Sequence, residues 1–236
     1  MLFEIPRSLF YRVEPLLVHL PYHYAHAGAV CTGIIPGTIL VDSDVTPTHA
    51  VILPDDGFCY CISLDNDVTF LQECNEYFFM QKKVDVLEVI VSCQTLADNI
   101  AILFGGRENF SIPRKLYTLD FSVFSRSTVS NIPEVTYNIT SGDSRVTIEM
   151  IYNHQNAGVC SALIYNRHAE IDISIHEEYR QKGWGTCLAY VATKYCVEHN
   201  IIPDWTCWDE KESSKRIAEK LGYALDSQFS VFIFEK

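Results

Sequence analysis

The sequence predicts an α+β protein in which a mixed, mostly antiparallel sheet is flanked by helices and is preceded by an N-terminal α/β subdomain. Two observations in the second half carry this prediction. Three β-type runs are joined by turns too short for a crossover helix, so these strands must run antiparallel. Two helical patterns and two further strands follow, which completes the order β-β-β-α-β-α-β. The first half mixes short strands and helices, with no evident internal repeat.

Composition and charge narrow the class of function. The chain has 236 residues, 48% hydrophobic and 20% charged, as expected for a globular protein with a real core. A net charge of -12 argues against nucleic-acid binding, because phosphate neutralisation needs clustered Lys and Arg. The same charge favours cationic small substrates such as amines.

We expect a cytoplasmic protein that does not enter a membrane. No apolar run approaches the length of a membrane span, and Glu4 and Pro6 interrupt the N-terminal apolar stretch, which is therefore unlike a signal peptide. Nine cysteines without a Cys-x-x-Cys pair indicate buried free thiols in a reducing compartment. Cys207 in particular is expected to be buried and unreactive.

The first half contains short strands and two helices. Asp67 is a candidate cap for a helix that ends near Lys82, and a second helix at 94–104 would stop at Gly105. The β-rich runs lie at 38–42, 49–53, 57–63, 84–91 and 117–124.

The second half has the cleaner pattern. Residues 125–144 are rich in Ser, Thr and Asn and are expected to be a linker, so we divide the chain into 1–124, 125–144 and 145–236. The apolar positions Leu188, Val191, Ala192 and Tyr195 form one helical stripe. The expected elements are strands at 145–152, 159–165 and 170–175, a helix at 185–199, a strand at 205–208, a helix at 212–221 and a final strand at 229–234.

One turn has a distinctive chemistry. Residues 179–186 read Tyr-Arg-Gln-Lys-Gly-Trp-Gly-Thr, between a predicted strand and the periodic helix. Gly183 and Gly185 lack a Cβ, so the backbone there can bend sharply and approach a ligand. A helix start has N–H groups without partners and carries about half a positive charge. Because Arg180 and Lys182 add positive charge, the turn predicts a pyrophosphate site.

Three other interpretations of this turn are possible. A Walker loop needs Gly-Lys followed by Ser or Thr, which is missing. The dinucleotide fingerprint needs a third glycine where Leu188 stands, and it lies in the turn that opens a βαβ array, whereas three antiparallel strands precede this turn. A glycine-rich turn that merely starts a helix is the structural alternative.

The segment around the turn resembles the acetyl-CoA signature of the GNAT superfamily. Arg-x-x-Gly-x-Gly at 180–185 is similar to its pyrophosphate loop, and Glu-Ile-Asp-Ile-Ser-Ile at 170–175 to its fourth strand. Pro-Asp-Trp-Thr-Cys-Trp at 203–208 and Ala-Glu-Lys-Leu-Gly-Tyr at 218–223 resemble a subgroup with a Trp-rich fifth strand, some members of which are linked to antibiotic self-resistance. The resemblance implies a GNAT-like fold and an acetyl-CoA-binding domain at 145–236.

The resemblance implies how acetyl-CoA would be held. In GNAT enzymes the pyrophosphate lies on the loop amides, and the fourth strand pairs with the pantetheine arm where strands four and five part. A serine of the following helix contacts the cofactor. The residues that match these positions, with their neighbours in the loop, are Ile173, Ser174, Ile175, Arg180, Gln181, Lys182, Gly183, Trp184, Gly185, Thr186 and Ser214.

The implied reaction is attack of a neutral amine on the thioester carbonyl. Deprotonating an amine of pKa about 10.4 at pH 7 costs about 4.6 kcal/mol, so a base is needed. Glu170 is the first candidate and Asp172 the second, because both lie on one face of the fourth strand; two solvent-facing carboxylates are the alternative. The tyrosine acid of many family members is Ala218 here, so Tyr223 or water is the candidate acid. Lys211 stands where the family often has an Asn that contacts the cofactor arm.

We therefore expect an acetyl-CoA-dependent N-acetyltransferase that acts on a small-molecule amine without a metal. A catalytically silent acyl-CoA-binding or interaction module and a nucleotide-binding domain of another class are the alternatives. His19, His23 and His26 lie close together, but no carboxylate or cysteine completes a metal set. The N-terminal part is expected to wall the acceptor, with a structural cap as the alternative. An exposed final strand would allow a homodimer.

Overall fold

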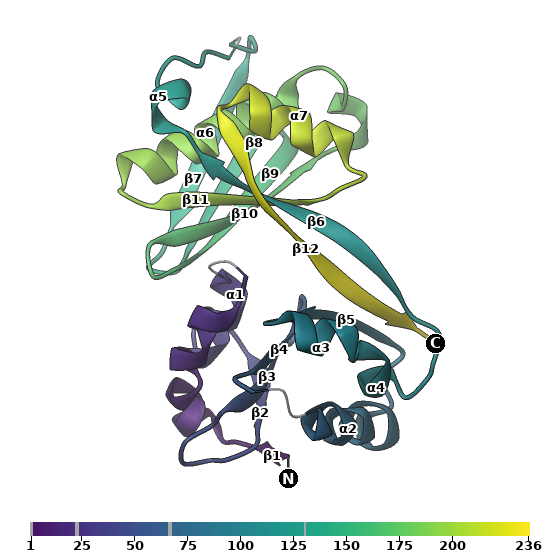
Figure 1. The fold of residues 1–236 in the computed structure, drawn as a ribbon. Helices are drawn as coiled ribbons and strands as arrows, with labels where there is room; N and C mark the ends of the chain where they lie inside the picture. The colour runs from purple at the N-terminus through teal and green to yellow at the C-terminus, as the bar shows by residue number, and fades with distance from the viewer. Residues whose placement is uncertain (1, 22–23, 66–67, 130) are drawn as a thin grey trace. The chain divides into compact units, whose positions relative to one another are not determined.

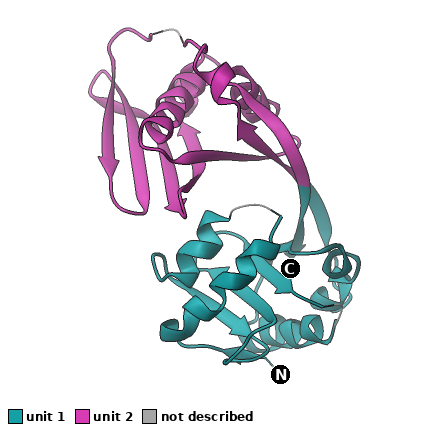
Figure 2. Cartoon of the chain, turned by 60° about the vertical axis from the view of Figure 1, so that its left-hand side comes forward, with its two compact units in different colours: residues 1–113, 229–236 teal, residues 114–228 magenta. Residues whose placement is uncertain are grey.

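The chain folds into two compact units, which Figure 2 shows in different colours. The computed structural model describes residues 2–21, 24–65, 68–129 and 131–236. Unit 1 consists of Met1–Pro113 and Phe229–Lys236, and unit 2 of Arg114–Gln228. Each unit has its own apolar core. Among the described residues, no helix combines the length and apolarity needed to cross a membrane.

Unit 1 is a sheet of short strands with helices packed against it (Figure 1). Strands β2, β3 and β4 form an antiparallel meander, β5 runs parallel to β4, and the end of β12 pairs antiparallel with β5. The elements are β1 (Phe3–Glu4), the 3-10 helices η1 (Arg7–Arg12) and η2 (Glu14–His19), α1 (Ala25–Cys31), β2 (Gly37–Val41), β3 (His49–Pro54), β4 (Cys59–Ser63), α2 (Thr69–Asn75), the π-helix η3 (Glu76–Lys82), β5 (Val86–Val91), α3 (Gln94–Asp98) and α4 (Ile100–Phe104).

Unit 2 is built on a longer sheet. Strands β7 to β10 are antiparallel neighbours, β11 runs parallel to β10, and β6 pairs antiparallel with β11. Ala189 of α6 and Ala218 of α7 share a core cluster with Trp205 and Cys207, so both helices cover one face of the sheet. The elements are β6 (Phe110–Leu119), α5 (Phe121–Phe124), β7 (Val135–Ser141), β8 (Arg145–Tyr152), β9 (Gln155–Tyr165), β10 (His168–Ile175), the 3-10 turn η4 (Glu177–Tyr179), α6 (Trp184–Glu198), β11 (Ile202–Trp208), α7 (Glu212–Lys220) and β12 (Tyr223–Glu235).

The two units repeat one order of elements, although the sequence shows no repeat. In each unit a run of antiparallel strands is followed by a helix, a strand parallel to the last strand of that run, and further helix. The closing strand of each unit comes from the other half of the chain. Strand β6 follows the helices of unit 1 but pairs with β11, whereas β12 follows α7 but pairs with β5. The halves of the chain therefore exchange their last strands.

Most predicted elements are confirmed to within a few residues, but the stretch at 117–124 is not one strand. Strand β6 ends at Leu119, and Asp120 caps the short helix α5. Its Oδ1 accepts hydrogen bonds from the N–H groups of Ser122 at 2.9 Å and Val123 at 3.2 Å. This cap ends the strand because it commits the next backbone amides to a helix start.

Two further expectations differ from the structure. The segment 125–144, expected as a linker, contains β7, which pairs with β8 along its length. The final strand is not an exposed edge, because β12 lies between β5 and β6 in the strand order, and the edges are β1 and β7. The compact units also have other boundaries than the predicted parts. Asp67 lies outside the described residues, and an acceptor wall in residues 1–124 stays a prediction.

The step from α7 into β12 depends on Gly222. This residue has a φ of +88°, and its carbonyl accepts a hydrogen bond from the Asp120 N–H at 2.9 Å. A Cβ at this position would lie 2.8 Å from Cγ1 of Val123 and 3.0 Å from the backbone N of Phe124. The position therefore needs both the left-handed backbone and the missing side chain of glycine.

We predict that Gly222→Ala lowers the free energy of unfolding of unit 2 by about 1–3 kcal/mol, through backbone strain and this clash. Because all three tryptophans lie in unit 2, urea unfolding followed by tryptophan fluorescence measures this unit selectively. Gly142→Ala is the control, since the nearest atom to its Cβ, the Arg145 carbonyl oxygen, is 3.8 Å away. Equal effects of the two substitutions would contradict the prediction.

A buried histidine holds the ends of the unit 1 meander. His49 is 6% exposed, and its Nδ1 lies 3.3 Å from Oδ2 of Asp42 while its Nε2 lies 3.0 Å from Oδ1 of Asp65. Partial burial would raise the pKa of Asp42. The hydrogen bonds that its carboxylate accepts from the N–H of His49, the hydroxyl of Thr48 and the N–H of Thr48 outweigh burial, so the pKa is lowered.

Asp42→Asn should destabilise unit 1 by about 1–3 kcal/mol at pH 7, because these hydrogen bonds are made to a charged acceptor. A lowered pKa in the folded state means that the contribution is complete above the unfolded pKa, about 3.9, and is lost as the pH falls below it. Urea unfolding followed by circular dichroism at pH 7, 5 and 3.5 tests this. A deficit of the variant that stays constant over this range would refute the assignment.

Candidate functional site

Two strands of unit 2 part and leave an opening in the sheet. Strands β10 and β11 pair in parallel only at His168–Ile202, Ala169–Pro203 and Glu170–Asp204. Beyond Glu170 the described strands form no further ladder pairs, although β10 runs on to Ile175 and β11 to Trp208. This separation agrees with the parting of the fourth and fifth strands that the family resemblance implies.

A cavity of about 710 Å³ occupies the opening, which is a volume typical of sites for small molecules and cofactors. It begins at the residues that directly follow the last strand pair and extends to the start of α6 and to α7. The lining residues are Ile171, Asp172, Ile173, Ile175, Arg180, Gln181, Gly183, Gly185, Thr186, Trp205, Thr206, Ser213, Ser214, Arg216 and Ile217.

The turn before α6 presents unpaired amides. Gln181 and Gly183 have φ of +60° and +82°, a left-handed alternation that turns successive N–H groups toward one concavity. The first hydrogen bonds of the helix run from the N–H groups of Thr186 and Cys187 to the carbonyl of Gly183. Within the part of the chain that the structure describes, the N–H groups of residues 181–185 donate no hydrogen bond, and no side chain caps α6.

Contacts on both sides hold the turn in this shape. The Nε of Arg180 donates to the Ile175 carbonyl at 3.0 Å, and the Nζ of Lys182 donates to the Glu178 carbonyl at 2.8 Å. The rings of Tyr179 and Trp184 stack with centroids 4.5 Å apart and an interplanar angle of 17°. The unpaired amides are therefore presented by a preorganised loop, and the positive end of a 15-residue helix adds to their attraction for an anion.

Not every predicted residue faces the cavity. Eight of the eleven predicted cofactor-binding residues line it, and the exceptions are Ser174, Lys182 and Trp184. Trp184 is buried in the core between Tyr179 and Tyr152. The residues that do line it are Ile173, Ile175, Arg180, Gln181, Gly183, Gly185, Thr186 and Ser214.

The two candidate bases differ in position. Ile171 and Ile173 pack against core residues of α6, so the alternation along β10 directs Glu170 and Asp172 to the opposite face of the sheet. Asp172 is exposed and lines the cavity, whereas Glu170 is half-buried, lies opposite Asp204 in the last strand pair, and does not line it. The geometry favours Asp172, the second sequence candidate, over Glu170.

Tyr223, the candidate acid, lies in the core. It is 3% exposed, does not line the cavity, and its hydroxyl lies 2.8 Å from Oγ1 of Thr193. Burial raises its pKa, which the hydrogen bond with Thr193 offsets only in part. Its ring packs on Trp205 at a centroid distance of 5.4 Å. Its position therefore supports a packing role beneath the cleft.

The structure adds residues that sequence reasoning missed. Thr206, Ser213 and Arg216 also line the cavity, and the helical spacing of Ser213 and Arg216 is the signal that predicts one common face on α7. Beside the last strand pair, Nδ1 of His168 lies 2.9 Å from Oδ2 of the buried Asp204. Burial lowers the pKa of His168. No local pattern links these two residues, which are 36 positions apart.

Neither a cysteine nor a metal site is part of the cleft. Cys207 is buried as predicted, and burial raises the pKa of its thiol more than the nearby Ser214 and basic residues lower it. No group of His, Cys, Asp and Glu side chains within residues 2–21, 24–65, 68–129 and 131–236 has metal-binding geometry. Of the predicted histidine cluster, His23 lies outside the described residues.

Unit 1 repeats the order of elements but not the opening. Strands β4 and β5 pair up to Cys61–Val91, and the contact continues because the Ser92 N–H donates to the Cys61 carbonyl and the Ser63 N–H to the Ser92 hydroxyl. The sequence between β4 and α2 is Leu-Asp-Asn-Asp-Val, without glycine and with two acidic residues. An anion would be repelled at this position.

Comparison with known proteins finds relatives of one part of the chain. Residues 150–232 match the sequence model of a family described as GNAT acetyltransferase. A segment of 80 residues is 32% identical to an uncharacterized N-acetyltransferase, YdfB, of Bacillus subtilis (strain 168), covering 34% of this chain. The match spans 31% of the length of that relative. Each match spans about a third of this chain, and residues 150–232 include the residues that line the cleft.

Solved structures show the fold over the whole chain. A GCN5-related N-acetyltransferase-like protein from Streptococcus suis has a TM-score of 0.69 at 18% identity, covering 95% of this chain and 98% of that one. A tandem GNAT protein from the clavulanic acid biosynthesis pathway has a TM-score of 0.70 at 11% identity, covering 100% and 98%. A GCN5-related N-acetyltransferase from Sphaerobacter thermophilus has a TM-score of 0.66 at 8% identity, covering 100% and 95%. At these identities the comparison shows the fold alone.

Proposed function

We propose that residues 150–232, which carry the sequence of a GNAT acetyltransferase domain, bind acetyl-CoA in the unit 2 cleft, and that the protein transfers the acetyl group to a small-molecule amine. The compartment we expect for this reaction is the cytoplasm. The proposal rests chiefly on the row of unpaired amides at 181–185. Five adjacent N–H groups at a helix start suit an anion such as the diphosphate of CoA.

The rest of the cleft suits the remainder of the cofactor. Arg180 and Arg216 supply positive charge at the lining, in a protein whose net charge is -12. Where the strands part, Ile173 and Ile175 offer the pantetheine arm an apolar wall. Beyond Glu170, the described part of β10 has no ladder partner in β11, so its backbone edge can bond to the arm. Ser214, held by a 3.2 Å hydrogen bond from the indole of Trp205, offers a hydroxyl near the arm.

Asp172 is the proposed proton acceptor. The amine nitrogen attacks the thioester carbonyl carbon, the C–S bond breaks, and the amine proton passes to the Asp172 carboxylate directly or through one water. The thiolate of CoA takes a proton from solvent, because Tyr223 lies below the cleft with its hydroxyl on Thr193. The carboxylates of Asp172 and Glu170 on one sheet face, together with the acidic surface, favour a cationic acceptor.

A silent acyl-CoA-binding module is the alternative function, favoured by the absence of the family's acid at Ala218. It shares the cofactor site and differs only in turnover, so binding and turnover are tested separately. The link to the antibiotic-resistance subgroup rests on the Trp-rich strand and the Ala-Glu-Lys-Leu-Gly-Tyr segment, and it makes amine-bearing antibiotics the first acceptors to assay.

The binding prediction uses a matched pair of glycine variants. Gly183 and Gly106 both have positive φ, and a Cβ at either would meet no atom within 4 Å. Gly183→Trp should weaken acetyl-CoA binding about tenfold or more in calorimetry, because its side chain would enter the cleft, while Gly106→Trp should leave binding unchanged. NAD and ATP are the competing ligands. Preferential binding of either one, or equal effects of the two variants, would refute the acetyl-CoA site.

The turnover prediction concerns Asp172. With an amine that the wild type acetylates, Asp172→Asn should lower kcat by about 10²–10⁴-fold. Acetyl-CoA affinity should change little, because the proposed contacts with the cofactor are made by the loop amides and the apolar wall. Glu170→Gln is the comparison and should retain most activity. Release of CoA thiol is the readout. If Glu170→Gln shows the larger loss, the base is Glu170; if no amine is acetylated, the silent module is correct.

A further inference from the structure

Unit 1 contains a second cavity, of about 330 Å³, which the proposed acyl transfer does not use. Its lining residues come from η3, from the segments that follow η3 and α4, and from the end of β12 with Lys236. Its lining combines apolar and basic side chains and includes no acidic one. The lining residues are Phe79, Met80, Lys83, Val84, Arg107, Phe234 and Lys236.

The floor of this cavity is aromatic and fixed. Phe79 and Phe234 meet edge to face with centroids 4.6 Å apart. Phe234 is 5% exposed and belongs to the core of unit 1, against which Phe79 and Val84 pack. A rigid apolar floor of this kind favours a flat or branched apolar group, because burying it removes apolar area from water without reorganising the protein.

Arg107 is held in place over this floor. Its Cζ lies 4.4 Å from the centroid of the Phe79 ring, and its Nη1 donates to the Phe104 carbonyl at 3.0 Å. A Cβ on Gly105 would lie 2.6 Å from that Nη1, so the glycine permits the close approach. The guanidinium is thus preorganised, and most of its N–H donors are left for a ligand with a planar acceptor pair.

The charges at this cavity are not balanced. Lys83 closes η3 with a left-handed backbone, φ +55°, and its N–H bonds to the Phe78 carbonyl. In the described part of the chain, neither Lys83 nor Arg107 has a carboxylate within ion-pair distance, whereas the Nζ of Lys236 lies 3.0 Å from Oδ1 of Asp85. The basic side chains of this lining are therefore not offset by an acidic side chain of the same lining.

We propose that this cavity binds a small carboxylic acid with an aromatic or branched apolar body. The guanidinium of Arg107 and the ammonium of Lys83 bind the carboxylate, and the Phe79–Phe234 floor receives the body. The volume suits a single small molecule and is less than half that of the unit 2 cleft. The site is separate from the acetyl-CoA site, so the two proposals stand or fall independently.

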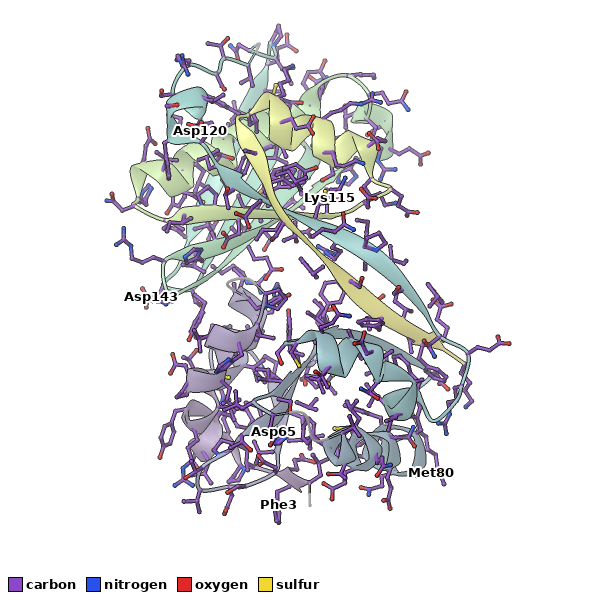
Figure 3. The ribbon with its side chains drawn as sticks, viewed as in Figure 1. Phe3, Asp65, Met80, Lys115, Asp120 and Asp143 are labelled. Carbon is purple, nitrogen blue, oxygen red and sulfur yellow. The ribbon has the colours of Figure 1, made fainter. Side chains whose placement is uncertain are left out.

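Methionine methyl groups provide a direct test. The chain has three methionines. Met80, which is labelled in Figure 3, lines the cavity and is 65% exposed, whereas Met150 is fully buried in unit 2. Titration of the ¹³C-methyl-methionine-labelled protein with phenylacetate should shift the Met80 signal saturably, with a Kd of about 1 mM or tighter for a ligand of this size. The Met150 signal should not move.

Matched ligands and variants separate the parts of the site. Phenylacetamide lacks the charge and acetate lacks the body, so each should bind at least about tenfold more weakly. Arg107→Gln and Lys83→Gln should each weaken phenylacetate binding, and Arg107→Lys should not restore it fully. Lys194→Gln, on the exposed face of α6, is the control for loss of one charge.

An unchanged urea unfolding midpoint, followed by circular dichroism, verifies that unit 1 of each variant is folded. Phenylacetamide binding as tightly as phenylacetate, or retention of affinity in Arg107→Gln, would overturn the proposal. It would also be overturned if the Met80 signal did not respond to phenylacetate at any attainable concentration. None of these outcomes bears on acetyl-CoA binding, which is measured in the other unit.

Discussion

Five consecutive backbone N–H groups at the start of α6 have no acceptor within the described chain, and the proposed function depends on them. Unpaired amides at a helix start are usually satisfied by a capping side chain or by water. Here Gly183 occupies the cap position with no side chain, and the stacked Tyr179 and Trp184 hold the turn open. The amides are therefore available to an anion whose oxygens are spaced like those of a diphosphate.

The opening between β10 and β11 leads to the proposed anion site. Since the strands pair only as far as Glu170 and Asp204, the cavity begins immediately beyond that pair and leads to the helix start. Unit 1 has the same order of elements, but β4 and β5 remain bonded and acidic residues precede α2. Two copies of one architecture thus differ in whether the parallel strands part, and among the described residues a cleft between these strands lies in unit 2.

Local patterns predicted much of this arrangement. The turn at 179–186 and the helix after it were predictable because glycine, basic residues and a helical apolar stripe act over short distances. Within the predicted strand 117–124, the end of β6 and the start of α5 were missed. The Asp120 cap between them depends on a backbone geometry that β-rich composition does not indicate. The choice between Glu170 and Asp172 needed the strand register, which places one at the last pair and the other at the cavity.

The long-range features of the fold could not be predicted from the sequence. The exchange of last strands joins β12 to β5 and β6 to β11, which no local signal encodes. The contact of His168 with Asp204 and the placement of Arg107 over Phe79 arise from the same tertiary pairing. These features place charged groups in buried or apolar surroundings, where only the folded chain shows their partners.

The central claim is tested most directly by the amide signals of residues 181–185 in ¹⁵N-resolved NMR spectra during a titration with CoA. The account predicts that these five signals move farthest, with downfield proton shifts as the N–H groups acquire phosphate acceptors, and that inorganic pyrophosphate reproduces part of the effect. CoA shifts confined to other residues, with these five signals unmoved at saturation, would contradict it.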